Sequence, residues 1–151
     1  MSGIIDTNIL LYAVNLDCPE HSAAREFLAA PDLLHGPCYI TEGICYEFLR
    51  VATHPRVFAT PITAAQALDF LESLVGDGRI HLLHPAEQHW KSLRAVVSAL
   101  VHPAGNLFFD IRTAALMRDS GIRTIHTADR DFLQFPGIEV IDPVHPAARG
   151  S

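Results

Sequence analysis

Hydrophobic residues along the chain follow two alternating patterns, and each pattern predicts one kind of element. Short, largely apolar runs, typical of strands buried on both faces, occupy residues 3–6, 38–40, 79–83, 122–127 and 138–141. Apolar positions at helical spacing predict helices that begin near Thr7 and cover residues 21–30, 41–53, 63–75, 86–101 and 106–120, with a short helical turn at 131–135. Thr41, Thr63 and Asn106 are residue types that favour helix N-caps, and Gly121 is placed to end the last long helix.

Strands that alternate with helices predict a parallel sheet covered by helices on both faces. We therefore expect an α/β/α sandwich with a central, mostly parallel five-stranded sheet. The chain has 151 residues and no internal repeat, so a single domain accommodates it. We assign residues 1–143 to that domain and expect the closing segment, residues 144–151, to be a flexible tail.

This arrangement carries four acidic residues to the carboxyl edge of the sheet, where open parallel sheets bind their ligands. Asp6 ends the first strand, and Asp129 lies two residues past the end of the fourth. Glu47 lies in the second turn of the helix that follows the second strand. Asp110 lies in the first turn of the helix that leads back into the fourth strand. The sequence therefore predicts that these four carboxylates meet at one rim.

The chemistry of such a rim follows from charge and burial. Glu47 borders the apolar stripe that contains Phe48, and Asp110 borders the stripe that contains Ile111, so we expect both carboxylates to be partly buried. Like charges in this setting have raised pKa values or bind a cation. Oxygen-only ligands suit Mg²⁺ or Mn²⁺, and these ions activate water for attack on phosphodiesters. The four acids therefore favour metal-assisted phosphodiester hydrolysis.

Net charge and hydropathy set only broad limits on the partners and the location of the protein. The formal net charge is −6, from 17 acidic and 11 basic residues, which by itself argues against a polyanionic partner. Acids that bind divalent ions no longer repel a polyanion, so net charge does not decide the question. No segment approaches the ~20 apolar residues of a membrane span, and the start lacks the basic region of a signal peptide. We therefore expect a cytoplasmic protein with no membrane partner.

Four segments of the chain contain these acids and their neighbours. They are IIDTNILLYA at the start, YEFLR around Glu47, NLFFDIRTAALMRDSG around Asp110 and TIHTADRDFLQFPGIEVIDP near the end. Together they resemble PIN domains, most of all those of the VapC toxins of bacterial toxin–antitoxin pairs. They cover almost the whole chain in the order expected for the family. The opening D-T-N and the closing T-x-D-x-D-F are each weak alone, but four motifs at these spacings are a strong match. His126, in the fourth strand, is a mild departure, because an apolar residue is more usual there.

The resemblance implies roles for particular residues and partners. It implies that Mg²⁺ or Mn²⁺ is coordinated by Asp6, Glu47, Asp110 and Asp129. It implies that Asn8 and Thr127 support the acids or the attacking water, and that Asp131 is a second, less central acid. It further implies an endoribonuclease that cleaves structured RNA such as tRNA or rRNA, a homodimer, and inhibition by a cognate VapB antitoxin. None of these partners follows from composition or spacing.

Each acid also has a purely structural interpretation. Asp6 could be the N-cap of the first helix. Glu47 could form a surface ion pair with Arg50, three residues further on. Asp110 and Asp131 could serve the positive ends of their helices. Only the joint arrangement of the acids distinguishes a metal centre from these local roles.

Two other functions place acids at the same edge of a parallel sheet. A receiver-like or phosphatase phosphoacceptor domain usually also needs a lysine near a strand end, and the only lysine, Lys91, lies in the middle of a predicted helix. A PIN-like binding module without catalysis is the second alternative. The presence of all four acids argues against it.

Overall fold

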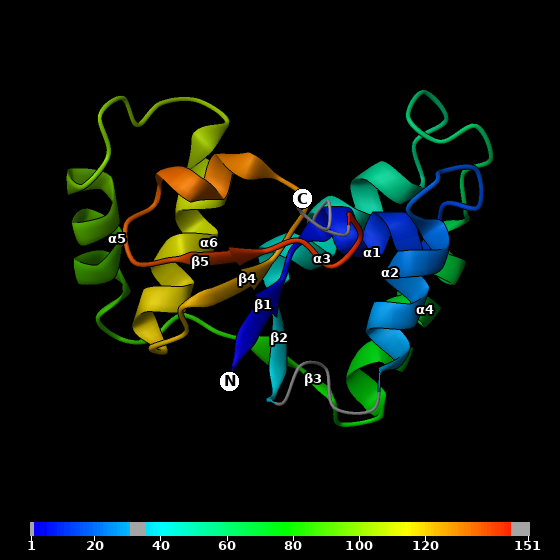
Figure 1. Cartoon of the computed structure of the whole chain (residues 1–151), viewed down its shortest axis with the longest axis horizontal. Helices are drawn as coiled ribbons and strands as arrows, with labels where there is room; N and C mark the ends of the chain where they lie inside the picture. The colour runs from blue at the N-terminus through cyan, green and yellow to red at the C-terminus, as the bar shows by residue number, and fades with distance from the viewer. Residues whose placement is uncertain (1, 31–35, 146–151) are drawn as a thin grey trace, which may run out of the picture.

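Five parallel strands form the centre of the molecule, as the sequence predicts (Figure 1). The computed structural model describes residues 2–30 and 36–145. The strands are β1 (Gly3–Ile5), β2 (Cys38–Thr41), β3 (Ile80–Leu83), β4 (Thr124–His126) and β5 (Glu139–Ile141). They pair in the order β3-β2-β1-β4-β5, and every pairing is parallel. Strand β1 is therefore central, and the ends of β2 and β4 flank its carboxyl end.

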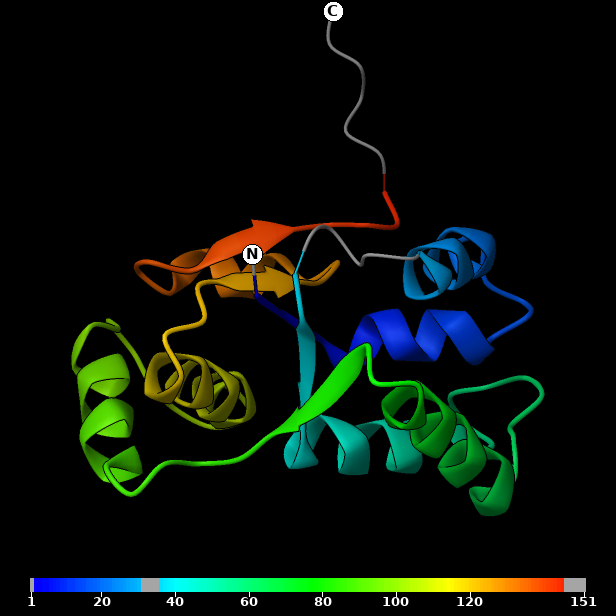
Figure 2. The ribbon, with the colours of Figure 1, turned by 90° about the horizontal axis from the view of Figure 1, so that it is seen from below.

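Helices pack around this sheet in two groups. They are α1 (Thr7–Val14), α2 (His21–Ala29), α3 (Glu42–Ala52), α4 (Ala64–Gly76), α5 (His89–Ser98), α6 (Leu107–Asp119) and the short 3-10 helix η1 (Arg130–Gln134). Helices α5 and α6 pack against each other in one group, and in the other α1 packs against α2 and α3, and α3 packs against α4 (Figures 1 and 2). The predicted α/β/α architecture is confirmed.

Several predicted helix ends are confirmed by their capping contacts. Thr41 caps α3, because its hydroxyl accepts a hydrogen bond from the Ile44 N–H at 3.1 Å. Thr63 caps α4 and shares a capping box with Gln66. Gly121 follows α6 with φ +68°, a left-handed conformation that glycine adopts without strain. These local signals start or stop the chain where the sequence places them.

Two other predicted helix features are wrong. Asn106 lies at the N-cap position of α6, but its backbone is already helical and its side chain makes no capping hydrogen bond. The helix predicted over residues 86–101 is shorter at both ends, since α5 covers only His89–Ser98. An isolated turn precedes α5, with the His89 N–H bonded to the Ala86 carbonyl, and the segment that follows it contains Pro103 and Gly105. Apolar spacing alone overestimates a helix with such flanks.

The hydrophobic core lies on both faces of the central strands. Ile4 and Ile5 in β1 and Ile125 in β4 are completely buried. Phe48 from α3 and Met117 from α6 are buried against them in the same core. A strand end fixed by such packing can hold a side chain rigidly, and this matters for Asp6, which directly follows β1.

The chain beyond β5 is packed further than the sequence predicts. Val144 is buried at 5% exposure, although the tail was expected to begin there. His145 contacts Asp142 at 2.8 Å and Glu20 at 3.1 Å. These two residues pack on the domain because Val144 belongs to the hydrophobic core and His145 has two acidic neighbours. Residues 146–151 of the predicted tail lie outside the described residues. None of the helices in residues 2–30 and 36–145 combines the length and the hydropathy that a membrane span needs.

Candidate metal centre

Five carboxylates gather where the parallel strands end. Asp6 directly follows β1, and Asp129 follows β4 and begins η1. Glu47 extends from α3, Asp110 from the first turn of α6 and Asp131 from η1. The charges of the other four acids all raise the pKa of Asp110, and those of Glu47 and Asp129 raise the pKa of Asp6. The predicted meeting of the acids at one rim is therefore present.

The carboxylate of Asp6 is held by three donors. Its Oδ1 accepts a hydrogen bond from the Thr7 N–H at 2.8 Å, so Asp6 does cap α1. Its Oδ2 accepts from the Thr127 hydroxyl at 2.8 Å and from the Asn8 Nδ2 at 3.3 Å. Asp6 is only 9% exposed. The capping role and the place in the acidic rim are thus compatible, because the cap uses only Oδ1.

Asn8 and Thr127 join the ends of β1 and β4. The Asn8 Nδ2 donates to the Thr127 hydroxyl at 2.8 Å, and the Asn8 Oδ1 accepts from the Ala128 N–H at 3.1 Å. The Thr127 hydroxyl also accepts from the Asp129 N–H at 3.0 Å. One donated and two accepted hydrogen bonds use the full capacity of this hydroxyl. Both residues, singled out only by family resemblance, therefore contact the acids directly.

Asp110, Asp129 and Asp131 form the tightest group of the five acids. One carboxylate oxygen from each lies within 4.8 Å of those from the other two. The Asp129 Oδ1 also accepts from the Asp131 N–H at 2.8 Å, which fixes its orientation. Asp131, expected to be the less central acid, is thus part of the tightest group. The signal in the sequence is its place two residues after Asp129, where the chain turns back into η1.

Glu47 differs from its predicted environment. We expected it to be partly buried, like Asp110, but Glu47 is exposed whereas Asp110 is half-buried. The buried stripe of α3 contains Ile44, Phe48 and Ala52, and it is narrow enough to leave Glu47 beside it in solvent. The Glu47 Oε2 accepts a hydrogen bond from the Thr7 hydroxyl at 3.2 Å, which keeps it next to Asp6.

Burial and mutual repulsion raise the pKa values of two acids in this rim, and no cationic side chain in the described structure compensates them. Burial, followed by the charges of Glu47 and Asp129, raises the pKa of Asp6 to about 6, although hydrogen bonds from Thr127 and Thr7 oppose the rise. Burial and the four neighbouring acids raise the pKa of Asp110 to about 7. Among the described residues, no lysine or arginine forms an ion pair with any of the five acids. In particular, Glu47 and Arg50 do not form the ion pair considered above.

A divalent cation fits this donor set. All the side chains that converge are carboxylates, with an amide and a hydroxyl behind them, and oxygen ligands of this kind suit Mg²⁺ and Mn²⁺. A dication would replace the protons that Asp6 and Asp110 otherwise retain near neutral pH. The residues present therefore fit the predicted metal centre.

A groove of about 310 Å³ adjoins the rim and contains Glu47 in its wall. It lies between α3 and α6, and its lining residues are Thr41, Gly43, Ile44, Tyr46, Glu47, Arg50, Phe109, Arg112 and Thr113. No local motif in the sequence marks the aromatic and arginine residues of this groove. On α3, positions 43, 46, 47 and 50 share one helical face, but their partners on α6 are more than fifty residues away in sequence.

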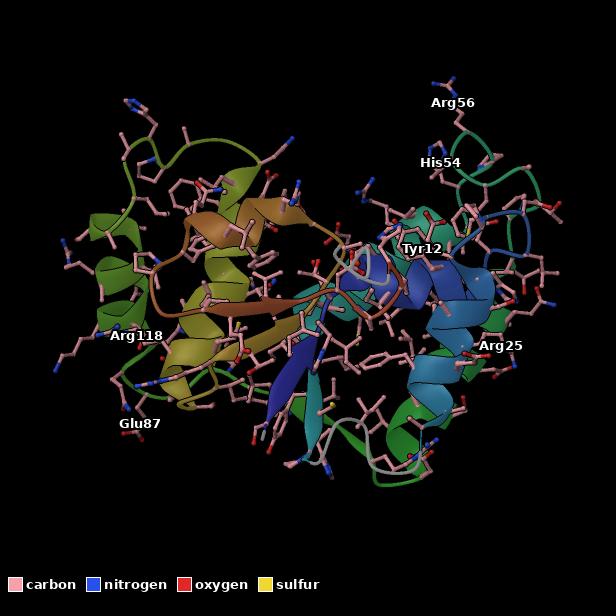
Figure 3. All side chains as sticks on the ribbon, in the orientation of Figure 1. Tyr12, Arg25, His54, Arg56, Glu87 and Arg118 are labelled. Atoms are coloured by element: carbon pink, nitrogen blue, oxygen red, sulfur yellow. The ribbon has the colours of Figure 1, made fainter. Side chains whose placement is uncertain are left out.

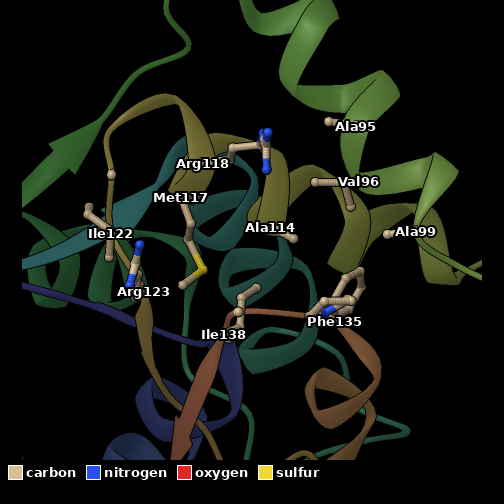
Figure 4. A pocket seen from close by; sticks show the side chains of 13 residues that line it. Ala95, Val96, Ala99, Ala114, Met117, Arg118, Ile122, Arg123, Phe135 and Ile138 are labelled. Carbon is tan, nitrogen blue, oxygen red and sulfur yellow. The ribbon is translucent and has the colours of Figure 1, made fainter.

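A larger cavity, of about 450 Å³, lies at the opposite edge of the sheet. It is lined by α5, by α6 near Arg118, and by the segments that lead into β4 and β5 (Figures 3 and 4). Ile122 and Ile138 in its wall precede their strands, so the cavity is at the amino edge. None of the acids or their supporting residues lines it. We therefore place the functional site at the carboxyl edge, despite the smaller volume there.

The fold and the acidic rim together define a PIN domain, and the chain belongs to the PIN domain family, whose pattern matches residues 4–138. The sequence is 34% identical over 147 residues to ribonuclease VapC48 of Mycobacterium tuberculosis, an alignment that covers 95% of this chain and 98% of the relative. It is 30% identical over 131 residues to ribonuclease VapC43 of the same species, with 87% and 88% covered.

Solved structures share the fold at lower identity. VapBC2 from Rickettsia felis, crystallised with a DNA fragment from its promoter, has a TM-score of 0.65 at 17% identity over 93% of this chain and 98% of that one. VapC20 of Mycobacterium tuberculosis, described as a toxin that cleaves the sarcin–ricin loop, has a TM-score of 0.62 at 16% identity over 91% and 98%. At these identities the likeness shows the fold alone.

Proposed function

We propose that this protein is a Mg²⁺- or Mn²⁺-dependent endoribonuclease and the toxin of a type II toxin–antitoxin pair. The observation that carries the proposal is the gathering of five carboxylates at the carboxyl edge, with the pKa of Asp110 raised to about 7 by burial and by the other acids. Similarity over nearly the whole chain to proteins named VapC ribonucleases supports RNA as the substrate.

In the proposed mechanism, Asp6, Glu47, Asp110 and Asp129 hold the metal and are the catalytic residues. A divalent ion bound there supplies activation of water and stabilisation of the leaving oxygen of the phosphodiester. The chain's own contribution is orientation. The Thr127 hydroxyl and the Asn8 amide keep the Asp6 carboxylate turned toward the rim.

Asp131 supports the same centre in this proposal. Its backbone N–H holds the Asp129 carboxylate, and its own carboxylate lies within 4.8 Å of those of Asp110 and Asp129. It therefore adds negative charge on the solvent side, where an incoming water needs an acceptor for its proton.

The partners of the proposed toxin follow from its relatives. Structured RNA such as tRNA or rRNA is the proposed target, supported by a structural neighbour described as cleaving the sarcin–ricin loop. A VapB-type antitoxin is the proposed inhibitor, supported by the VapBC2 structure. We also propose that the protein forms a homodimer and acts in the cytoplasm, where these RNAs are found.

The test is cleavage of end-labelled total tRNA and rRNA by the purified protein with Mg²⁺ or Mn²⁺. We expect discrete products that disappear with EDTA and with Asp6→Asn, and that persist with Asp69→Asn, the same change at an exposed position on α4. If neither RNA pool is cut although metal binding is measurable by calorimetry, the protein is a binding module and the ribonuclease proposal is wrong. Cleavage that survives in Asp6→Asn would mean that another enzyme contaminates the preparation.

A further inference from the structure

Two aromatic side chains flank the groove between α3 and α6. Tyr46 from α3 is 66% exposed and Phe109 from α6 is 68% exposed. Ring pairs occur elsewhere in the described part of the chain, but neither of these rings takes part in one. Isolated exposed apolar residues are ordinary on a protein surface. Two unpaired rings on facing helices, beside the same groove, instead suit a planar ligand.

Two guanidinium groups line the same groove. Arg50 and Arg112 are exposed, and among the described residues neither forms an ion pair with a carboxylate. The guanidinium of Arg112 lies over Gly43, where a Cβ atom would come within 2.9 Å of its Nη1. The missing side chain at Gly43 therefore leaves the space in which this cation rests. An apolar partner surface would have to desolvate both cations without pairing them, whereas a phosphate would pair with them.

Glu47 connects this groove to the acidic rim, because it lines the groove and also accepts a hydrogen bond from Thr7 beside Asp6. A ligand in the groove therefore extends directly to the metal centre. This position also explains how RNA, a polyanion, can approach a rim of five acids. Arg50 and Arg112 attract its phosphates beside the carboxylates that repel them.

We propose that this groove binds an unpaired nucleotide of the RNA next to the phosphodiester that is cut. A base stacks against both Tyr46 and Phe109, and its phosphate lies on Arg112 with Arg50 nearby. Stacking on aromatic rings is how proteins hold single-stranded bases without reading their sequence. The inference rests on the proposed ribonuclease function and adds to it a substrate form, since only a nucleotide outside a helix presents a free base.

Equilibrium binding of a labelled pool of short single-stranded RNA tests the proposal. The measurements use the full chain with Asp6→Asn, in Mg²⁺, so that the RNA stays intact. We expect Tyr46→Leu and Phe109→Leu each to weaken binding by about tenfold or more, and Tyr46→Phe to bind as the parent does. We expect Arg112→Gln to weaken binding and to reduce the slope of log affinity against log salt by about 0.7.

Matched controls carry the same changes outside the groove. Trp90→Leu and Arg94→Gln alter an exposed aromatic and an exposed arginine on α5, and we expect both to bind RNA as the parent does. Gly43→Ala is a second way to move the Arg112 guanidinium. We expect it to lower RNA affinity while thermal unfolding stays unchanged or rises, because alanine is the better helix former.

Three results would overturn the groove proposal. The leucine variants could bind as tightly as the parent, or the α5 controls could lose as much affinity. Sedimentation could instead show that Tyr46→Leu or Phe109→Leu dissociates a dimer, with RNA affinity following the loss, and the groove would then be an interface between two copies. Failure of the ribonuclease proposal looks different: the wild type cuts no RNA, whether or not the groove variants change binding.

Discussion

Asp6 and Asp119 are aspartates whose side chains are largely shielded from solvent, yet their pKa values shift in opposite directions. The Asp119 side chain has no exposed area, and its Oδ2 lies 2.7 Å from His89 Nδ1 and accepts from the Ala86 N–H at 3.2 Å. Burial opposes ionisation there, but hydrogen bonds from Ser92, His89 and the Ala86 backbone outweigh it and lower the pKa of Asp119. At Asp6, burial and neighbouring acids outweigh the hydrogen bonds and raise the pKa to about 6.

The difference separates a structural carboxylate from a functional one. Asp119 ends α6, and its Oδ2 contacts His89 in the first turn of α5 and accepts from the Ala86 N–H just before it, so this oxygen links the two helices, although the buried Oδ1 has no hydrogen-bond partner in the described structure. Asp6 and Asp110 are surrounded by other acids, so their charge stays uncompensated until a cation arrives. The residue type is the same in both places, but the neighbouring groups differ. The neighbours decide which carboxylate can do chemistry.

The largest expected effect comes from Asp110→Asn. We expect RNA cleavage to fall by about 100-fold or more, because even residues behind a metal ligand contribute about 10- to 100-fold. The same variant should be more stable without metal, by on the order of 1–2 kcal/mol near pH 8, since one repelling charge is gone and Asp110 is only half-buried. Cleavage rates and thermal unfolding in EDTA measure both effects. Lower stability together with full activity would contradict the assignment.

Asp119→Ala should have the opposite profile. Removing this carboxylate leaves His89, Ser92 and the Ala86 N–H without their acceptor, which we expect to lower the free energy of unfolding by about 2–3 kcal/mol. The melting temperature should fall by about 5–10 °C. Cleavage per folded molecule, measured well below that temperature, should not change. A variant as stable as the wild type would show that the α5–α6 contact does not depend on this charge.

The contrast between these carboxylates could be predicted only in part. Alternating strand and helix patterns predict the parallel sheet, and the rule that ligands bind at its carboxyl edge brings Asp6, Glu47, Asp110 and Asp129 together. The sequence has no comparable rule for Asp119 and His89, which are thirty residues apart and meet only because α5 packs on α6. Local capping signals were reliable at Thr41 and Thr63, where the partner lies three residues away.

Side-chain environments were harder to predict than positions. Glu47 is in its expected place but exposed, because helical phase gives a direction and not the width of the buried stripe. Asp131 belongs to the tightest acidic group because η1 turns the chain back within two residues, which apolar periodicity does not encode. Tyr46 and Phe109 share a groove only in the folded chain. Such contacts depend on tertiary packing, which no local pattern specifies.

The pH dependence of stability without metal should sharpen the comparison further. Asp6 and Asp110 have raised pKa values, about 6 and about 7, so the folded chain binds more protons than the unfolded chain above about pH 4. Their contribution to stability is complete below about pH 4 and is lost as the pH rises through about 6–7. Mg²⁺ or Mn²⁺ should therefore stabilise the protein by on the order of 1–2 kcal/mol near pH 7.5 and by much less near pH 5. Thermal unfolding with metal and with EDTA at both pH values measures this difference, and equal stabilisation at both would contradict it.

The smallest expected effect concerns His126. This buried side chain has neither the hydrogen-bond partners of Asp119 nor the proposed cation of the acidic rim. Burial lowers its pKa to about 4, and its Nδ1 has no hydrogen-bond partner in the described structure. Its ring packs 5.1 Å from that of Phe27, and it fits only because a Cβ at Gly3, 2.6 Å from its Nε2, is absent. We expect His126→Leu to raise the free energy of unfolding near pH 7 by under about 1 kcal/mol, since an unpaired buried nitrogen is replaced by carbon.

The sign of the His126 contribution with pH is opposite to that of the acids. Because its folded pKa, about 4, lies below the unfolded value, stability is lost as the pH falls from about 6.5 toward 4. His126→Leu should remove that loss, and Asp110→Asn should flatten the slope in the other direction, so the two variants separate contributions that partly cancel in the wild type. RNA cleavage by His126→Leu should stay unchanged, because His126 meets the rim only through its backbone carbonyl, which accepts from the Asp6 N–H at 3.0 Å. A loss of stability near pH 7 would instead mean that the imidazole contributes packing that leucine does not replace.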